Sequence, residues 1–181
     1  MQTRKDTRPM RMDGKVAIVA GAAWGGIGAA SAYRFACEGA RVVVNTRSRE
    51  DKLLETVARI QTAGGQAVPV MGDAAEERTW ELLVRTALEH YGRVTTLLYN
   101  PAGGAGKKAA DLTRDEWERG LGVTLTGAWL AAKHCIPEMI RAGGGAIVFI
   151  STVNSIITNP NFGLYSAGKA GLNALGRSIA V

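Results

Sequence analysis

The sequence has few residues that could form disulfides or bind metals. Its two cysteines, Cys37 and Cys135, lie far apart in the chain and in no paired motif. Both fall in predicted helices among apolar neighbours, so we expect buried free thiols, a state that suits a reducing cytoplasm. The two histidines, His90 and His134, have no cysteine or carboxylate at ligand spacing. The pattern therefore predicts a cytoplasmic protein without a metal site.

Long apolar runs are also absent. No segment approaches the roughly 18–20 apolar residues that cross a membrane. Residues 1–12 are basic but no apolar stretch follows them, which excludes a secretory signal, and we interpret them as a disordered leader. That leader carries about half of the net charge of +6. The remaining chain has no basic stripe with interleaved aromatics, so we predict no nucleic-acid and no membrane partner. Anionic ligands such as phosphates explain the remaining charge at least as well.

The sequence does contain a regular alternation of two patterns. Short, nearly all-apolar runs, typical of parallel strands buried on both faces, occupy residues 16–20, 41–45, 67–70, 95–99 and 146–150. Helical spacing of apolar residues occupies 26–38, 49–63, 76–90, 113–141 and 163–180. Thr113 and Glu116 form a capping-box pattern, and Gly39, Gly64 and Gly92 stand where helices end. These patterns predict an α/β fold, a doubly wound parallel sheet of Rossmann type over residues 13–181.

The first predicted strand runs directly into a glycine-rich turn. The turn reads Gly21-Ala22-Ala23-Trp24-Gly25-Gly26-Ile27-Gly28, and a predicted helix follows it. Backbone N–H groups and the helix dipole can hold a pyrophosphate there, with Gly21, Gly26, Ile27 and Gly28 as candidate cofactor-binding residues. A tight strand–helix turn without a ligand is the alternative. A Walker-type loop is excluded at Gly106-Lys107, because Lys108 follows instead of Ser or Thr.

The end of the second predicted strand bears on the choice of cofactor. An acidic residue there would bind the ribose 2′-OH of NAD and repel a 2′-phosphate. The sequence reads Asn45-Thr46-Arg47-Ser48-Arg49, and Thr46 stands 18 positions after Gly28, where the acid belongs. Arg47 and Arg49 could pair with a 2′-phosphate. The pattern favours NADP(H), with NAD(H) possible, and makes Thr46 and Arg47 candidate cofactor-binding residues.

Tyr165 and Lys169 stand at the start of the last predicted helix. Their spacing of four places both side chains on one helix face. A free tyrosine has a pKa of about 10, and a neighbouring cation lowers that pKa. The pair is therefore a candidate proton-transfer unit. By itself such a pair is common on helices, and a solvated helix face would be the better interpretation.

Taken in order, these motifs resemble the short-chain dehydrogenase/reductase family, and the resemblance runs from about Asp13 to Val181. The branch that the sequence resembles most contains the 3-oxoacyl-carrier-protein reductases and related alcohol dehydrogenases. The matching pieces are the glycine turn, Met71-Gly72-Asp73-Ala74, Leu97-Leu98-Tyr99-Asn100-Pro101-Ala102-Gly103, Trp117 through Gly127, Ile150-Ser151-Thr152, and Tyr165 with Lys169.

The resemblance implies a catalytic role for four residues. Tyr165 would protonate a carbonyl oxygen, or deprotonate an alcohol in the reverse direction. Lys169 would bind the nicotinamide ribose and lower the pKa of Tyr165. Thr152, thirteen positions before Tyr165, would polarise the substrate oxygen, with Ser151 beside it as the other candidate hydroxyl.

The resemblance also implies cofactor contacts and a reaction. Asp73 would accept a hydrogen bond from the adenine amino group, while Asn100 and Gly103 would line the nicotinamide side. The expected activity is an NADP(H)-dependent oxidoreductase that transfers hydride between the nicotinamide and a small-molecule carbonyl or secondary alcohol. Family members are usually homodimers or homotetramers, so we expect one of these assemblies for a full-length chain.

Four departures from the family pattern stand out. The glycine turn is one residue longer than usual and contains Trp24, and Pro101 interrupts the Asn-Ala-Gly tract. Thr124 stands where the family has an asparagine that helps to hold a proton-relay water. Thr152 replaces the usual catalytic serine, keeping the hydroxyl but adding a methyl group.

Family members are also longer than this chain, so we expect it to be truncated at the C-terminus and to lack the last two strands of the sheet. The alternative to an active enzyme is a catalytically impaired fragment or pseudoenzyme that binds the cofactor without turnover.

Overall fold

The alternating patterns fold into alternating strands and helices. The structure is a computed structural model that describes residues 10–104 and 106–180. The strands are β1 (Val16–Ala20), β2 (Arg41–Thr46), β3 (Gln66–Met71), β4 (Thr96–Tyr99) and β5 (Ala146–Phe149). The α-helices are α1 (Ile27–Cys37), α2 (Glu50–Thr62), α3 (Glu77–Tyr91), α4 (Arg114–Leu121), α5 (Gly127–Arg141) and α6 (Gly163–Ile179). Short 3₁₀ turns occupy Ala109–Asp111 and Val153–Ser155.

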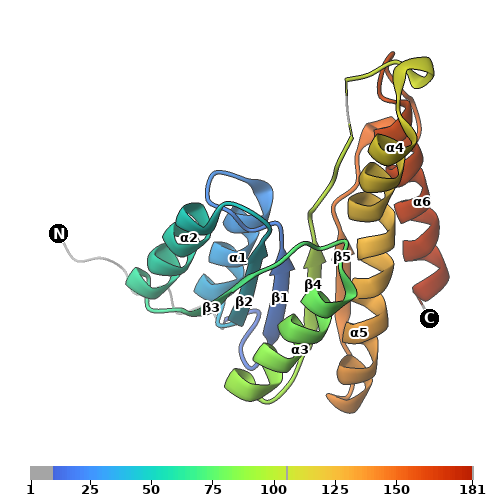
Figure 1. Ribbon diagram of the computed structural model, residues 1–181. Helices are drawn as coiled ribbons and strands as arrows, with labels where there is room; N and C mark the ends of the chain where they lie inside the picture. The colour runs from blue at the N-terminus through green and yellow to red at the C-terminus, as the bar shows by residue number, and fades with distance from the viewer. Residues whose placement is uncertain (1–9, 105, 181) are drawn as a thin grey trace.

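Within the described residues, the five strands form one parallel sheet in the order β3-β2-β1-β4-β5 (Figure 1). Val19 of the central strand β1 pairs with Val44 on one side and Leu98 on the other. The chain adds β2 and β3 on one side of β1 and then crosses back to add β4 and β5 on the other side. The order in which strands are added therefore reverses between β1 and β4. This switch point is where open α/β sheets bind ligands, and the fold confirms the predicted doubly wound Rossmann type.

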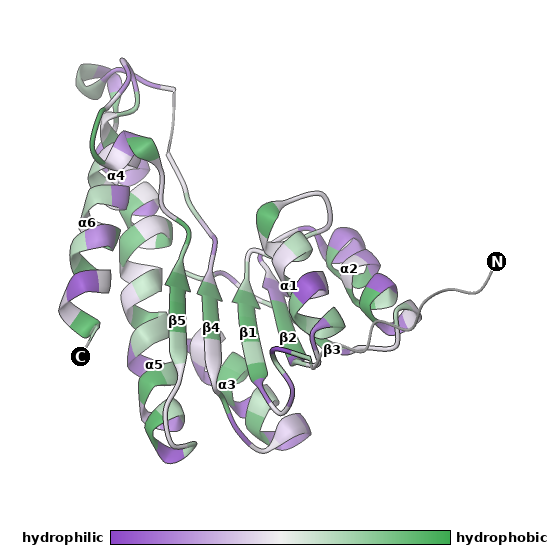
Figure 2. Ribbon diagram, turned by 180° about the vertical axis from the view of Figure 1, so that it is seen from behind, coloured by the Kyte–Doolittle hydropathy of each residue, from purple (hydrophilic) through white to green (hydrophobic). Residues whose placement is uncertain are grey.

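Helices cover both faces of the sheet, and β1 divides its side chains between them. Val16, Ile18 and Ala20 join a core with α3, α5 and α6, whereas Ala17 and Val19 join one with α1 and α2. Figure 2 shows the strands as the most hydrophobic layer of the molecule. Burial on both faces therefore explains the apolar runs of β1, β2 and β4, whereas β5 at the edge of the sheet has no buried residue.

The segment predicted as one helix over 113–141 is interrupted. Its start is as predicted, because Thr113 and Glu116 form the complete capping box. Residues Gly122–Thr126 then adopt a π-helical turn between α4 and α5. The Tyr99 hydroxyl donates a hydrogen bond to the Val123 carbonyl in this turn. A Cβ on Gly127 would lie 2.4 Å from both Ala74 O and Tyr99 Oη, so the helix passes very close to the sheet here.

Two further expectations need correction. Cys135 is buried, and burial raises the pKa of its thiol to about 12, but Cys37 is exposed. The buried stripe of α1 contains Ala32 and Ala36, and Cys37 lies one residue beyond that stripe. Its apolar neighbours in the sequence therefore misled the prediction.

Part of the basic leader is also ordered. Residues 1–9 of that leader lie outside the described residues. The expectation of disorder does not hold for residues 10–12, because Arg11 forms an ion pair with Glu38 at 2.9 Å and the Met12 amide donates to Glu38 O at 2.8 Å. In residues 10–104 and 106–180, no helix is long and apolar enough to cross a membrane.

Candidate active site and family membership

A cavity of about 480 Å³ opens where β1, β2, β3 and β4 end. Five of the residues predicted to bind a cofactor line it: Gly21, Thr46, Arg47, Asp73 and Gly103. They come from four different strand ends, and the parallel sheet brings these ends to one edge.

The glycine turn lies beside this cavity and leads into α1. Gly21 has a φ of +73°, and a Cβ there would lie 3.1 Å from Asn100 Nδ2. A Cβ on Gly28 would lie only 2.3 Å from Gly21 O, so the start of α1 packs directly on the turn. Gly26 caps α1 without a side-chain hydrogen bond, and no acidic residue occupies the first helical turn. Ile27 is exposed beside it. The helix N-terminus is therefore open to an anion.

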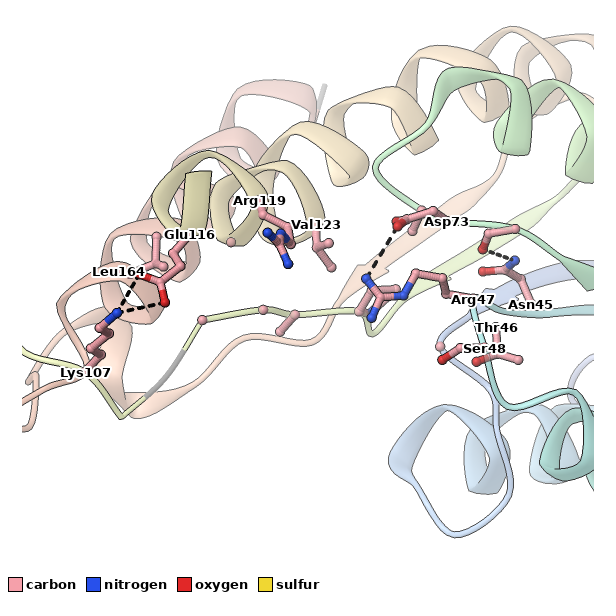
Figure 3. A pocket seen from close by; sticks show the side chains of 18 of the residues that line it. Asn45, Thr46, Arg47, Ser48, Asp73, Lys107, Glu116, Arg119, Val123 and Leu164 are labelled. Carbon is pink, nitrogen blue, oxygen red and sulfur yellow. Dashed lines mark hydrogen bonds and ion pairs between the residues drawn. The ribbon is translucent and has the colours of Figure 1, made fainter. Parts of the chain in front are cut away.

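At one end of the cavity, Arg47 and Asp73 face each other (Figure 3). Their closest charged atoms lie 3.5 Å apart, and both side chains are partly exposed. The Asp73 Oδ1 atom accepts a hydrogen bond from the Ala75 amide at 3.0 Å, which fixes the carboxylate on the loop after β3. Thr46 is buried at the end of β2 and its carbonyl accepts from the Gly72 amide at 3.0 Å.

The loop after β4 is fixed at two points. Asn100 donates from Nδ2 to Gly21 O at 3.0 Å and so joins this loop to the glycine turn. The Thr124 hydroxyl accepts from the Gly103 amide at 3.0 Å and lies 3.4 Å from Gly103 O. Thr124 belongs to the π-helical turn and is buried. It therefore connects α4 and α5 with the loop that carries Asn100 and Gly103.

Tyr165 and Lys169 share one face of α6, as their spacing predicts. The Lys169 Nζ atom lies 5.9 Å from the centre of the Tyr165 ring. The Lys169 side chain is only 1% exposed and donates a hydrogen bond to Ile150 O at the end of β5. Burial lowers the pKa of Lys169 to about 8. Tyr165 is half-buried, and its ring packs edge-on against Phe162 with 6.1 Å between ring centres.

The two candidate hydroxyls follow β5 directly. Thr152 Oγ1 accepts from the Asn154 amide at 3.3 Å and begins a 3₁₀ turn. Ser151 Oγ is buried and has no hydrogen-bond partner among the described residues. Asn173 of α6 donates to Ser155 Oγ at 2.8 Å, which ties this segment to the helix of Tyr165 and Lys169. Ser151 and Thr152 thus follow β5 and Tyr165 and Lys169 lie on α6, with the Lys169–Ile150 and Asn173–Ser155 hydrogen bonds joining the two segments. None of the four residues lines the cavity.

The other end of the cavity contains residues that the sequence reasoning missed. Lys107 and Glu116 form an ion pair at 2.7 Å, and this hydrogen bond is the main cause that lowers the pKa of Glu116 to about 2. Figure 3 shows Arg119 between this pair and the Arg47–Asp73 pair. The capping-box pattern identified Glu116 as a helix-start residue, but no local signal pointed to its contact with Lys107.

Asn45 is another residue that sequence reasoning did not select. It is 1% exposed near the end of β2, and its Nδ2 atom donates to Val70 O at 3.1 Å and Gly72 O at 3.0 Å. It thereby fixes the loop that carries Asp73. The signal was present in the sequence, since a polar amide at the end of an all-apolar strand needs buried partners.

Comparison with known proteins adds to this geometry. The family described as short chain dehydrogenase matches residues 15–181. The chain belongs to this family. Among curated members, a 7alpha-hydroxysteroid dehydrogenase from Clostridium sardiniense is 38% identical over 174 residues, which is 94% of this chain and 66% of that protein. An uncharacterized oxidoreductase from Thermotoga maritima is 37% identical over 170 residues, which is again 94% of this chain and 66% of that protein.

Solved structures of the family have the same fold. A structure described as a short-chain dehydrogenase/reductase from Burkholderia xenovorans superposes with a TM-score of 0.87 at 35% identity. The match covers 94% of this short-chain dehydrogenase chain and 69% of the other. The chain therefore spans about two thirds of the length of these relatives. The family uses nicotinamide cofactors, NAD(H) or NADP(H), and acts on small molecules.

Proposed function

We propose that this chain binds NADP(H) in preference to NAD(H) and transfers a hydride between the nicotinamide and a carbonyl or secondary alcohol. The observation that carries the catalytic half is the placement of Lys169. Lys169 is buried and lies beside Tyr165. It donates a hydrogen bond to Ile150 O, directly after β5, and Ser151 and Thr152 follow Ile150 in the chain. A cation in this place would stabilise the negative charge that develops as Tyr165 gives up its proton.

The residues around the glycine turn fit the pyrophosphate of such a cofactor. The first turn of α1 offers backbone N–H groups without a side-chain cap or an acid. Gly28 lets α1 begin in contact with Gly21, because any side chain there would collide with the turn. Gly26 and Ile27 supply the first amides of the helix. Asn100 and Gly103 lie in the loop after β4, which Asn100 joins to Gly21, and would contact the nicotinamide side of the cofactor.

The end of β2 supports the phosphorylated cofactor. Arg47 and Ser48 line the cavity next to Thr46, and all three lack negative charge. Arg47 would exchange its contact with Asp73 for a 2′-phosphate, which leaves Asp73 to accept from the adenine amino group. Glu50 and Asp51 follow in the first turn of α2, so the preference depends on direct pairing by Arg47 rather than on net charge.

The chemistry divides between the cofactor and three groups of the chain. The bound nicotinamide supplies or accepts the hydride. Tyr165 gives its phenolic proton to the carbonyl oxygen during reduction and takes it back during oxidation. Lys169 keeps a positive charge next to that proton transfer. A hydroxyl from Thr152 or Ser151 donates to the substrate oxygen and holds it near Tyr165.

The substrate class rests on the resemblance to 3-oxoacyl reductases and on relatives described as hydroxysteroid dehydrogenases. We propose a 3-oxoacyl thioester or an alicyclic ketone as the first compounds to test. For the protein in its cell, we propose a cytoplasmic homodimer or homotetramer.

Replacement of Tyr165 by Phe tests the proposal. We expect Tyr165→Phe to lower turnover of the best ketone by about 10²–10⁴-fold, because the proton donor is lost, while NADPH affinity stays within about twofold. Tyr33→Phe on α1 is the matched control and should keep full activity. Undiminished turnover in Tyr165→Phe contradicts the catalytic assignment.

The second candidate function is cofactor binding without turnover. The observation that favours it concerns Thr124, which by resemblance stands at the asparagine position of the family. Its hydroxyl is already hydrogen-bonded to Gly103. If the unmodified chain binds NADPH but reduces none of the ketones or thioesters, this second function replaces the first.

A further inference from the structure

The lengthened part of the glycine turn is attached to α2. The Thr56 hydroxyl donates to Ala22 O at 2.8 Å, and the Trp24 amide donates to Lys52 O at 2.9 Å. Thr56 is fully buried, so this hydrogen bond is shielded from water. The two contacts hold the middle of the turn from one side.

The Trp24 ring makes a third contact with α2. The guanidinium carbon of Arg59 lies over the ring, 4.2 Å from its centre. Glu55 orients that guanidinium through hydrogen bonds to Nε at 3.2 Å and Nη2 at 2.9 Å. A guanidinium held in plane by a carboxylate and stacked on indole is a favourable cation–π geometry. We name Trp24, Thr56 and Arg59 together the turn anchor.

The turn needs such an anchor because glycines with positive φ flank it. Gly21 has a φ of +73° and Gly25 a φ of +96°, and glycine leaves the backbone free to adopt many other conformations. Ala22, Ala23 and Trp24 lie between these two positions. Without contacts to α2, the direction of the turn at the start of α1 would be poorly defined.

The hydrogen bonds of the anchor leave the amides at the start of α1 available. Trp24, Thr56 and Arg59 do not line the cavity that contains Gly21 and Arg47. Their contacts use the Ala22 carbonyl and the Trp24 amide and do not involve the amides at the start of α1. The anchor therefore acts on the cofactor only through the position of the backbone.

We propose that Trp24 and Thr56 are positioning residues for the cofactor pyrophosphate. They hold the longer turn so that the first amides of α1 point at the phosphates. This inference rests on the proposed function, because it assumes that a dinucleotide binds at this turn. It predicts that loss of the anchor weakens ligands with a pyrophosphate and spares ligands without one.

The test compares two ligands that share the adenosine group. ADP-ribose carries a pyrophosphate on the 5′ oxygen of its adenosine, whereas 2′-AMP carries a single phosphate on the 2′ oxygen and no pyrophosphate. Binding of each is measured by isothermal titration calorimetry with the 181-residue chain and its variants. Circular dichroism and thermal melting of each variant show whether it is folded.

Each variant changes one side chain of the turn anchor, and the Thr56 hydroxyl also bonds to Lys52 O within α2, at 3.1 Å. Trp24→Ala removes the ring, Trp24→Phe keeps an aromatic face under Arg59, and Thr56→Val removes the hydroxyl at nearly constant volume. Thr62→Val is the matched control, because Thr62 lies on the same helix and its exposed hydroxyl bonds to Ala58 O within the helix, at 2.8 Å.

We expect Trp24→Ala and Thr56→Val to lower the affinity for ADP-ribose by about tenfold and to change the affinity for 2′-AMP by no more than about twofold. Trp24→Phe should recover most of the lost affinity, and Thr62→Val should match the unmodified chain. Equal losses for both ligands, or no loss for either, overturn the inference. If the unmodified chain does not bind ADP-ribose at all, the proposed dinucleotide site itself is wrong.

Discussion

The hydroxyl of Thr124 satisfies both backbone groups of Gly103. It accepts from the Gly103 amide at 3.0 Å and lies 3.4 Å from the Gly103 carbonyl oxygen. Gly103 lines the cavity, while Thr124 belongs to the π-helical turn between α4 and α5. One side chain thus links the cavity wall to the helix layer.

This relationship predicts different effects for two conservative changes at Thr124. Thr124→Val removes the hydrogen bonds that the hydroxyl makes with the Gly103 N–H and C=O, and we expect a loss of about 1–3 kcal/mol in the free energy of unfolding. We also expect weaker NADPH binding, because the cavity wall loses its fixed position. Thr124→Ser keeps the hydroxyl and should retain cofactor affinity despite losing a buried methyl group. Urea denaturation and NADPH titration measure both effects, and equal affinity in the Val and Ser variants would contradict this role.

The contact between Gly28 and Gly21 predicts a steric effect. A Cβ at residue 28 would lie 2.3 Å from Gly21 O, so Gly28→Ala must displace the backbone of the turn. We expect a loss of at least ~2 kcal/mol in unfolding free energy and the loss of dinucleotide binding. Gly163→Ala is the control, because nothing lies within 4 Å of its Cβ position at the start of α6. A Gly28→Ala variant as stable as the control would show that α1 starts differently.

The position of Arg47 predicts how selectivity changes. Arg47→Ala should lower the affinity for NADPH by roughly 10–100-fold, which is the range for the loss of a charged hydrogen bond. The affinity for NADH should change by no more than about twofold. Its ion pair with Asp73 is partly exposed, so we expect little change in stability. Arg78→Ala, at an exposed position of α3, is the control for the loss of one positive charge. Parallel losses for both cofactors would mean that Arg47 does not contact the 2′-phosphate.

The buried Lys169 predicts a pH dependence of stability. Burial lowers its pKa from the ordinary 10.5 to about 8. Between these values the unfolded chain binds more protons at this residue than the folded chain, so its contribution makes unfolding harder as the pH rises from about 8 to 10.5. Below about pH 8 the contribution is constant.

The measurement compares urea denaturation of the unmodified chain and Lys169→Met across this pH range, with exposed Lys108→Met as the control. The difference in unfolding free energy between the unmodified chain and Lys169→Met should move in favour of the unmodified chain as the pH rises. A difference that does not change with pH would contradict a lowered pKa for Lys169.

The sequence predicted the fold well wherever a pattern is local. Strand β1 matches its predicted bounds, and the capping box at Thr113 and Glu116 is confirmed. The helical spacing over 113–141 did not reveal the π-helical turn, because one extra residue in the helix hardly changes an apolar spacing of three to four. The close approach of Gly127 to Ala74 and Tyr99, directly after this turn, involves residues that are distant in sequence and that helical spacing does not reveal.

The candidate site was predicted in part for the same reason. Motifs identified Gly21, Asp73, Tyr165 and Lys169, and strand order explains why the first two share a cavity. The Arg47–Asp73 and Lys107–Glu116 ion pairs join segments that the sequence keeps apart, so neither could be read from spacing. The exposure of Cys37 depends on its angle around α1, which neighbouring apolar residues do not reveal.

We propose a nicotinamide-dinucleotide site at the glycine turn that favours the phosphorylated cofactor. Its most direct test is an equilibrium titration of the purified chain with NADPH and with NADH, followed by the change in cofactor fluorescence. We predict saturable binding of both cofactors, with NADPH binding at least about tenfold more tightly. Tighter binding of NADH would contradict the assignment of Arg47 to a 2′-phosphate. Failure of both cofactors to bind would contradict the site itself.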